Sequence, residues 1–215
     1  MVYDMITHTK QGRINPTSVV AIQADLLLLL GKASNIHLHN ACTRGHLPAV
    51  RVLAEQYPLN VRANDNSALR WACRRGHLPV VVYLSEHYGL TIGDARACDN
   101  DALCMASRNS HLPVVQYLSE HYGLTIDDAR ACNNYALRGA SENGDLSMVR
   151  YLAEHYQLTR EDARMHSSGA LCMAGYNGHL SVVKYLIGHF QYLERADVHG
   201  ALRWASAHGH LPVVE

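Results

Sequence analysis

The sequence carries no net charge and no membrane-length apolar run. Its 215 residues contain 19 Lys and Arg against 19 Asp and Glu. A neutral chain lacks the broad positive field that draws proteins to nucleic acid or to anionic membranes, so we expect neither partner. The apolar stretch from Leu26 to Leu30 is far shorter than the roughly 18 residues of a membrane-spanning helix. With Pro16 ahead of it, the stretch favours a buried helix over a signal peptide or anchor.

Known signatures of catalysis and of metal binding are also missing. The chain has no GxSxG motif, no phosphate-binding glycine loop, no HExxH and no CxxC pair. Adjacent acids such as Asp127 and Asp128 point about 100° apart on a helix, which suits a first helical turn better than acid–base chemistry. We therefore expect no enzymatic activity, no cofactor and no metal in this chain. A catalytic domain elsewhere in a longer protein stays open.

A repeat fills most of the sequence. The glycine of the segment RGHLP, or its serine substitute, recurs at spacings of 31, 34, 34, 34 and 31 residues. Its positions are Gly45, Gly76, Ser110, Gly144, Gly178 and Gly209. We infer a capping segment with one helix over residues 1–34 and six repeats over residues 35–215, the last incomplete. Because an incomplete repeat leaves an open apolar end, we expect a monomer whose C-terminus frays or makes end-to-end contact with another copy.

Each repeat has the pattern of two short amphipathic helices. The first helix carries Leu38, Leu69, Leu103, Leu137, Leu171 and Leu202, with Ala41, Ala72, Ala106, Ala140, Ala174 and Ala205 three positions later. The second carries Val50, Val81, Val115, Val149 and Val183, with Leu53, Leu84, Leu118, Leu152 and Leu186 three positions later. Helices this short are marginal alone, so stacking must supply the core and the expected fold class is all-α.

The segment ALRWACRRGHLPVVVYL, residues 68–84, resembles the helix pair of an ankyrin repeat, whose usual pattern is TPLHxAAxxGHxxVVxLL. The resemblance implies an ankyrin-like helical solenoid that acts as a protein–protein interaction scaffold and binds a partner on its concave face. The array is similar to the tandem arrays of intracellular bacteria and giant viruses. That similarity implies a cytoplasmic protein or an effector delivered into a host cell. Alternatively, the chain is the substrate-targeting portion of a larger protein whose activity lies outside it.

Two departures from the family concern the start of the first helix and the linker. TPLH is replaced by segments such as SALR, so we expect the preceding column to cap the helix. That column holds Asn66, Asn100, Asn134 and Ser168. Thr91, Thr125 and Thr159 are each followed three residues later by aspartate, which approximates a capping box. We expect a short helical turn where the family has a β-hairpin, and shorter, less regular joins at the two 31-residue spacings.

An arginine recurs fourteen residues before the glycine position of repeats two to six. The column is Arg62, Arg96, Arg130, Arg164 and Arg195. Two interpretations are open. Each arginine pairs with a neighbouring carboxylate or helix C-terminal carbonyl, or the column forms a positive ladder for an acidic partner segment. We favour the first, because a binding surface usually varies from repeat to repeat.

Most cysteines and histidines share a repeat phase, and residues of one phase lie a repeat apart rather than around one ion. We therefore expect the six cysteines to be small core residues in a reducing compartment. The scaffold histidines are His46, His77, His111, His179 and His210 after the repeat glycine, and His87, His121, His155 and His189 late in the second helix. His208 and His210 give only a weak metal signal.

The resemblance places partner contacts on one concave side, formed by the linkers and the ends of the first helices. The two residues before each repeat glycine match the family's variable contact positions; a solvated helix end is the alternative. The expected set is Arg44, Arg74, Arg75, Arg108, Asn109, Glu142, Asn143, Tyr176, Asn177 and His208. Arg75 and Tyr176 are of types that often dominate interface energies. Trp71 and Trp204 are expected in the core between repeats.

Overall fold

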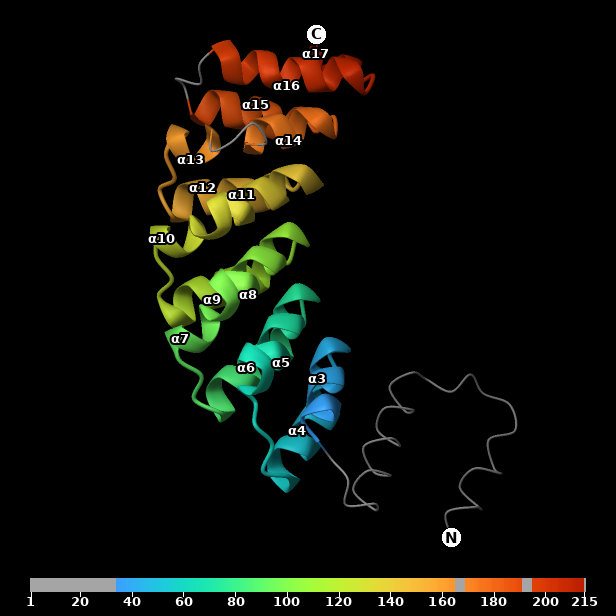
Figure 1. The fold of residues 1–215 in the computed structure, drawn as a ribbon, viewed down its shortest axis with the longest axis vertical. Helices are drawn as coiled ribbons and strands as arrows, with labels where there is room; N and C mark the ends of the chain where they lie inside the picture. Colours follow the sequence, from blue (N-terminus) through green and yellow to red (C-terminus); the bar gives the residue numbers. More distant parts are fainter. Residues whose placement is uncertain (1–33, 165–168, 191–194, 215) are drawn as a thin grey trace, which may run out of the picture.

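The computed structural model describes residues 34–164, 169–190 and 195–214, which form a curved stack of helix pairs (Figure 1). The first helices are α3 (Asn35–Thr43), α5 (Ala63–Arg74), α8 (Ala97–Arg108), α11 (Ala131–Asn143), α14 (Ala170–Tyr176) and α16 (Arg195–Ala207). The second helices are α4 (Leu47–Gln56), α6 (Leu78–His87), α9 (Leu112–Tyr122), α12 (Leu146–His155), α15 (Leu180–His189) and α17 (Leu211–Val214). No strand occurs in these ranges, so the all-α solenoid is confirmed. The expected capping helix lies outside the described residues.

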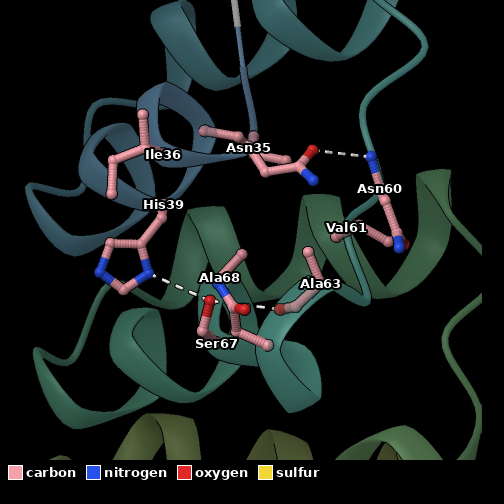
Figure 2. Close-up of a pocket in the computed structure, with 10 residues that line it drawn as sticks. Asn35, Ile36, His39, Asn60, Val61, Ala63, Ser67 and Ala68 are labelled. Carbon is pink, nitrogen blue, oxygen red and sulfur yellow. Dashed lines mark hydrogen bonds between the residues drawn. The ribbon is translucent and has the colours of Figure 1, made fainter.

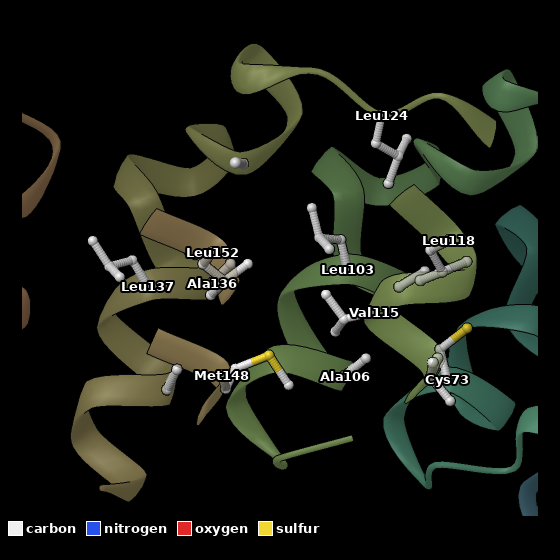
Figure 3. Close-up of a cluster of buried hydrophobic side chains, with 14 of the residues drawn as sticks. Cys73, Leu103, Ala106, Val115, Leu118, Leu124, Ala136, Leu137, Met148 and Leu152 are labelled. Carbon is white, nitrogen blue, oxygen red and sulfur yellow. The ribbon is translucent and has the colours of Figure 1, made fainter. Parts of the chain in front are cut away.

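The core consists of the columns that the repeat predicts. All five valines and all five leucines of the second helices are buried, as are the six alanines of the first helices. Among the leucines of the first helices, Leu202 alone is half-buried. Figure 3 shows how neighbouring pairs interlock, with Met148 of α12 pointing toward Ala106 of α8. The hydrophobic surface that one pair cannot hide is thus covered by the next pair.

The cysteines divide into two groups, which corrects the expectation that all six lie in the core. Cys42, Cys73 and Cys104 are buried, and burial raises the pKa of the Cys42 and Cys104 thiols to about 12. Cys172 is half-buried, whereas Cys98 and Cys132 are exposed. Cys98 and Cys132 lie in the left-handed segments at the start of α8 and α11, where the Cys132 thiol is 3.7 Å from the carbonyl oxygen of Asp99.

The linkers contain the predicted helical turns α7 (Ile92–Ala95), α10 (Ile126–Ala129) and α13 (Arg160–Arg164). Thr91 and Thr125 begin the first two turns, each in a capping box with the aspartate three residues later. The join over residues 57–62, at one of the two shorter spacings, contains no helical turn. The other short join falls on residues 191–194, outside the described ranges.

A left-handed turn lies at the start of three first helices, α5, α8 and α11. It comprises residues 64–66, 98–100 and 132–134, with φ between 51° and 61° at every residue. The asparagine at its end was expected to cap the helix, and this is wrong for Asn66 and Asn100, whose Oδ1 atoms accept no hydrogen bond in the described structure. Asparagine is favoured here because it tolerates the left-handed conformation better than most residues. Ser168 lies outside the described residues.

Neighbouring repeats touch at a glycine and a histidine. His77, His111, His179 and His210 each place Nε2 at 2.9–3.1 Å from a backbone carbonyl oxygen at the end of the preceding repeat's first helix. A Cβ atom at Gly45, Gly76, Gly144 or Gly178 would overlap the ring of the histidine that follows it in the stack. These glycines also have φ between 70° and 77°. Glycine is therefore required twice, by the backbone and by the packed imidazole.

One pair of successive repeats has neither the glycine nor the histidine of this contact. Ser110 replaces the glycine, with φ 63°, and Asp145 replaces the histidine of the next repeat. The Asp145 carboxylate accepts a hydrogen bond from Met148 N at 3.0 Å and so caps α12. Asn143 Nδ2 donates to Ser110 Oγ at 2.7 Å. A side chain is present at residue 110 in the one step whose following repeat lacks the bulky imidazole.

A second pairing between repeats joins a tyrosine to a serine of the preceding second helix. The hydroxyl of Tyr122 donates to Ser85 Oγ at 2.6 Å, and that of Tyr156 lies 2.5 Å from Ser119 Oγ. The corresponding residues in the next step are Ala153 and Phe190, which both lack the hydroxyl. In the first step the corresponding residues are Ala54 and Tyr88, and the buried Tyr88 hydroxyl has no hydrogen-bond partner among the described residues.

Tyr88→Phe is therefore expected to raise the free energy of unfolding by about 1 kcal/mol, because it removes a buried hydroxyl that makes no hydrogen bond. Tyr122→Phe is expected to lower it by a similar amount, because the buried hydrogen bond that Tyr122 donates to Ser85 is lost. Urea unfolding of both variants measures the two effects. Equal losses in the two variants would contradict the pairing, and Ala54→Ser provides the reverse check by giving Tyr88 an acceptor.

Candidate functional site

The regular spacing of the linker arginines is explained by ion pairs with buried aspartates. Asp128, in α10, is 3% exposed and accepts hydrogen bonds from Thr125 N at 2.8 Å and Thr125 Oγ1 at 3.1 Å. Arg96, from the preceding linker, donates to the same carboxylate from Nε at 2.7 Å and from Nη2 at 2.9 Å. One aspartate thus completes its own helical turn and holds the neighbouring linker.

The same arrangement recurs along the stack. Arg62 pairs with Asp94 at 2.9 Å, and Arg130 pairs with Asp162 at 2.7 Å. Arg164 also interacts with a neighbouring group, and the Arg195 side chain lies outside the described part. For Arg62, Arg96 and Arg130 the carboxylate-pairing interpretation is confirmed, and these three charges do not form a positive ladder for a partner.

The pairing holds the linker aspartates in their charged form. Burial alone would raise the pKa of Asp128, but hydrogen bonds from Arg96 and Thr125 outweigh burial and hold the pKa below its usual 3.8. Asp94 and Asp162 have lowered pKa values for the same reasons. At the linker edge, the charges of these arginines and aspartates therefore neutralise each other within the scaffold.

The predicted contact residues lie at the opposite edge of the stack. Figure 1 shows α7, α10 and α13 along the outer side of the curve, and the turns between first and second helices along its inner side. The linkers and the ends of the first helices therefore do not share one side, which corrects the expectation from the resemblance. The reason is length, because the regular helical part of α5, residues 67–74, separates its two ends by about 12 Å.

Most predicted contact residues are exposed on this inner edge. The exposed ones are Arg44, Arg74, Arg75, Arg108, Asn109, Asn143, Tyr176 and His208, and the half-buried ones are Glu142 and Asn177. Two pairs of these residues are in direct contact, Arg108 with Glu142 and Tyr176 with His208. Arg108 donates to Glu142 at 3.1 Å and to the hydroxyl of Tyr135. The rings of Tyr176 and His208 lie 4.1 Å apart, centre to centre.

Tryptophan belongs to this face rather than to the core, which corrects the sequence expectation. Trp204 is 36% exposed and its ring lies 5.6 Å from that of Tyr176. Trp71 is half-buried, with the Arg74 guanidinium 4.7 Å above its ring centre. Each tryptophan precedes a buried alanine and so faces about 100° away from it. The side chains in this column range in size from tryptophan at Trp71 and Trp204 to glycine at Gly139. This variation was the signal in the sequence that the column is not part of the regular core.

A small pocket lies at the start of the array, between α3, α5 and the join that links their repeats. Its volume is about 290 Å³ and its polar residues are hydrogen-bonded to one another. Figure 2 shows Asn60 N donating to Asn35 Oδ1 at 3.0 Å, and His39 Nδ1 lying 3.2 Å from Ser67 Oγ. Burial and the nearby Arg70 charge lower the pKa of His39. The described lining residues include no carboxylate, and the Ser67 hydroxyl donates to the carbonyl oxygen of Ala63 at 3.3 Å.

Two further features bear on the class of the protein. Within the described ranges, no three His, Cys, Asp or Glu side chains gather closely enough to hold a metal ion, including those around His208 and His210. None of the helices in the same ranges has the length and apolar character needed to cross a membrane.

Comparisons with known proteins agree with this architecture. A sequence profile of ankyrin repeats (3 copies) matches residues 21–95 and 137–215, and a profile of ankyrin repeats (many copies) matches residues 101–153. No curated protein sequence matches significantly. The ankyrin repeat domain of human ASB11 superimposes with a TM-score of 0.60 at 20% identity, over 82% of this chain and 81% of that one.

The ankyrin repeat domain of Bcl-3, a member of the IkappaB family, superimposes with a TM-score of 0.55 at 24% identity, over 82% of each chain. At these identities the similarity supports the fold alone. Neither comparison supports the bacterial or viral subtype expected from the sequence. Because the first profile alone matches more than half of the residues, the chain belongs to the ankyrin-repeat family.

Proposed function

We propose that the protein is a scaffold without a reaction of its own, which binds a partner protein along the exposed last turns of its first helices. Ankyrin-repeat domains are generally protein-binding and typically non-catalytic. The inner edge of the curve is the concave side on which a partner can contact several repeats at once. The same face would serve a larger protein as its substrate-recognising portion.

The observation that carries the proposal is the contrast between the two edges. At the linker edge, arginine and aspartate repeat in the same roles and satisfy each other. At the inner edge, the position before the repeat glycine holds arginine, asparagine or histidine, and the position before that holds threonine, arginine, glutamate, tyrosine or alanine. A scaffold requirement would select one residue type, whereas recognition of a particular partner selects different types at different repeats.

Affinity capture tests the proposal by comparing the wild type with a variant that carries Arg75→Ala, Glu142→Ala and Tyr176→Ala. We expect at least one partner to bind the variant about tenfold more weakly, since arginine and tyrosine often dominate interface energies. The matched control changes Glu86, Glu120 and Lys184, which are exposed on second helices. Identical capture by all three proteins would exclude the proposed face.

A further inference from the structure

We propose that the last turns of α3 and α5 bind an extended acidic segment of a partner protein. The site is the basic patch, which we define as Arg44, Arg74 and Arg75. The proposal rests on the protein-binding function above and names the chemistry of the segment that is bound.

The scaffold does not require arginine at this position. The column that contains Arg44 and Arg75 continues as Asn109, Asn143, Asn177 and His208. Asn109 Nδ2 donates to the carbonyl of Met105 at 2.7 Å, and Asn177 Nδ2 donates to that of Met173 at 3.0 Å. A short amide is therefore enough to satisfy a carbonyl in the last helical turn. The carbonyl contact therefore does not require the long, charged side chains of Arg44 and Arg75.

The charges of the basic patch are not neutralised by carboxylates of the described residues, unlike those of the linker arginines and of Arg70 and Arg108. Arg62, Arg96 and Arg130 each bind a buried aspartate. Arg70 pairs with Asp101 at 2.9 Å, and Arg108 pairs with Glu142 at 3.1 Å. By contrast, Arg44, Arg74 and Arg75 are exposed and make no ion pair with a carboxylate of the described residues.

Trp71 completes the patch with an aromatic surface. The guanidinium groups of Arg74 and Arg75 lie 4.7 Å and 6.0 Å from the centre of its ring. A guanidinium that stacks on a ring keeps its N–H groups directed outward in its own plane, where they can bind a carboxylate with two hydrogen bonds. The half-buried ring also offers apolar contact to the chain of a bound segment.

The spacing of the repeats sets the spacing of the acids. Arg44 and Arg75 occupy one column in successive repeats, and packed helices lie about 8–10 Å apart. An extended chain advances about 3.3 Å per residue, so two acidic residues about three positions apart match the two arginines. The patch is small, and the linker arginines are already neutralised by aspartates. These features favour a short acidic peptide over the continuous phosphate backbone of nucleic acid.

Selection of random linear peptides displayed on phage against the full chain tests this inference. We expect the selected peptides to be enriched in aspartate and glutamate at a spacing of about three positions. The test variant carries Arg44→Asn and Arg75→Asn, the residue that the array itself uses at this position, so the fold is retained. The control carries Arg51→Ala and Arg150→Ala, which removes two exposed arginines that stack on Tyr83 and Tyr185 of the second helices.

A selected peptide, synthesised and labelled, is then titrated with each protein and with competing oligonucleotides. The test variant should bind about tenfold more weakly and the control unchanged, as expected for the loss of two exposed ion pairs. Selected peptides without an acidic excess, or with equal affinity for the test variant, would overturn this inference and leave the protein-binding function intact. Failure to select any peptide would count against both. An oligonucleotide that outcompetes the peptide at the same arginines would replace the acidic segment by nucleic acid.

Discussion

Gly76→Ala is expected to lower the free energy of unfolding by about 4 kcal/mol. About 1–2 kcal/mol comes from placing alanine at φ 74°, a backbone conformation that is unfavourable for a residue with a Cβ atom. The remainder comes from the new Cβ, which would lie 2.7 Å from two ring carbons of His111. Relief of that overlap would displace the imidazole from its 3.1 Å contact with the carbonyl of Arg74.

Gly89→Ala separates the two contributions. Gly89 also has a positive φ, 55°, but a Cβ there would meet no atom within 4 Å. Its substitution should therefore cost only the conformational part, about 1 kcal/mol. Chemical unfolding of both variants, followed by circular dichroism, gives the comparison. Equal losses at the two glycines would show that the histidine contact contributes nothing.

The pair of repeats with Ser110 and Asp145 in place of glycine and histidine allows the reverse experiment. Asp145→His alone should be destabilising, because the ring would meet the side chain of Ser110 and the carboxylate cap of α12 would be lost. Adding Ser110→Gly should recover part of that loss. The recovered free energy, measured as the coupling in a double-mutant cycle, reports the glycine–histidine contact directly.

Asp128→Ala is expected to lower the free energy of unfolding by about 2–3 kcal/mol. The substitution removes the acceptor that caps α10 and leaves Arg96 without its partner. We place the loss below that of a fully buried pair because the Arg96 side chain is 43% exposed and can be solvated. Asp127→Ala is the matched control, since Asp127 is the exposed neighbour in the same turn and should change stability by less than about 0.5 kcal/mol.

The dependence on pH checks the same ion pair independently. The folded-state pKa of Asp128 lies below its usual value, so the folded protein binds fewer protons in acid than the unfolded chain does. The contribution of Asp128 is complete above about pH 4 and is lost as the pH falls below that value. The wild type should therefore lose stability in acid more steeply than Asp128→Ala. Parallel pH profiles would contradict the pairing.

Much of the fold follows from the sequence because a repeat removes ambiguity. Residues of one phase share one environment, so a column of leucine or valine identifies the core even where one helix alone would be ambiguous. The helical linkers were predictable because threonine and aspartate form a local capping box. The partner-binding residues stay a prediction; the variation along Arg44, Asn109 and His208 indicates only where the scaffold imposes no single residue type.

Tertiary structure decided the features that depend on a neighbouring repeat. Asparagine favours both a helix cap and a left-handed turn, and only the backbone path shows that Asn66 and Asn100 adopt the turn. The orientation of Trp71 and Trp204 depends on which side of the first helix the next pair covers. Arg96 and Arg75 have the same charge in the sequence. Arg96 pairs with a buried carboxylate from the following linker, whereas Arg75 is exposed, because packing brings Asp128 to Arg96 and brings no acid of the described residues into an ion pair with Arg75.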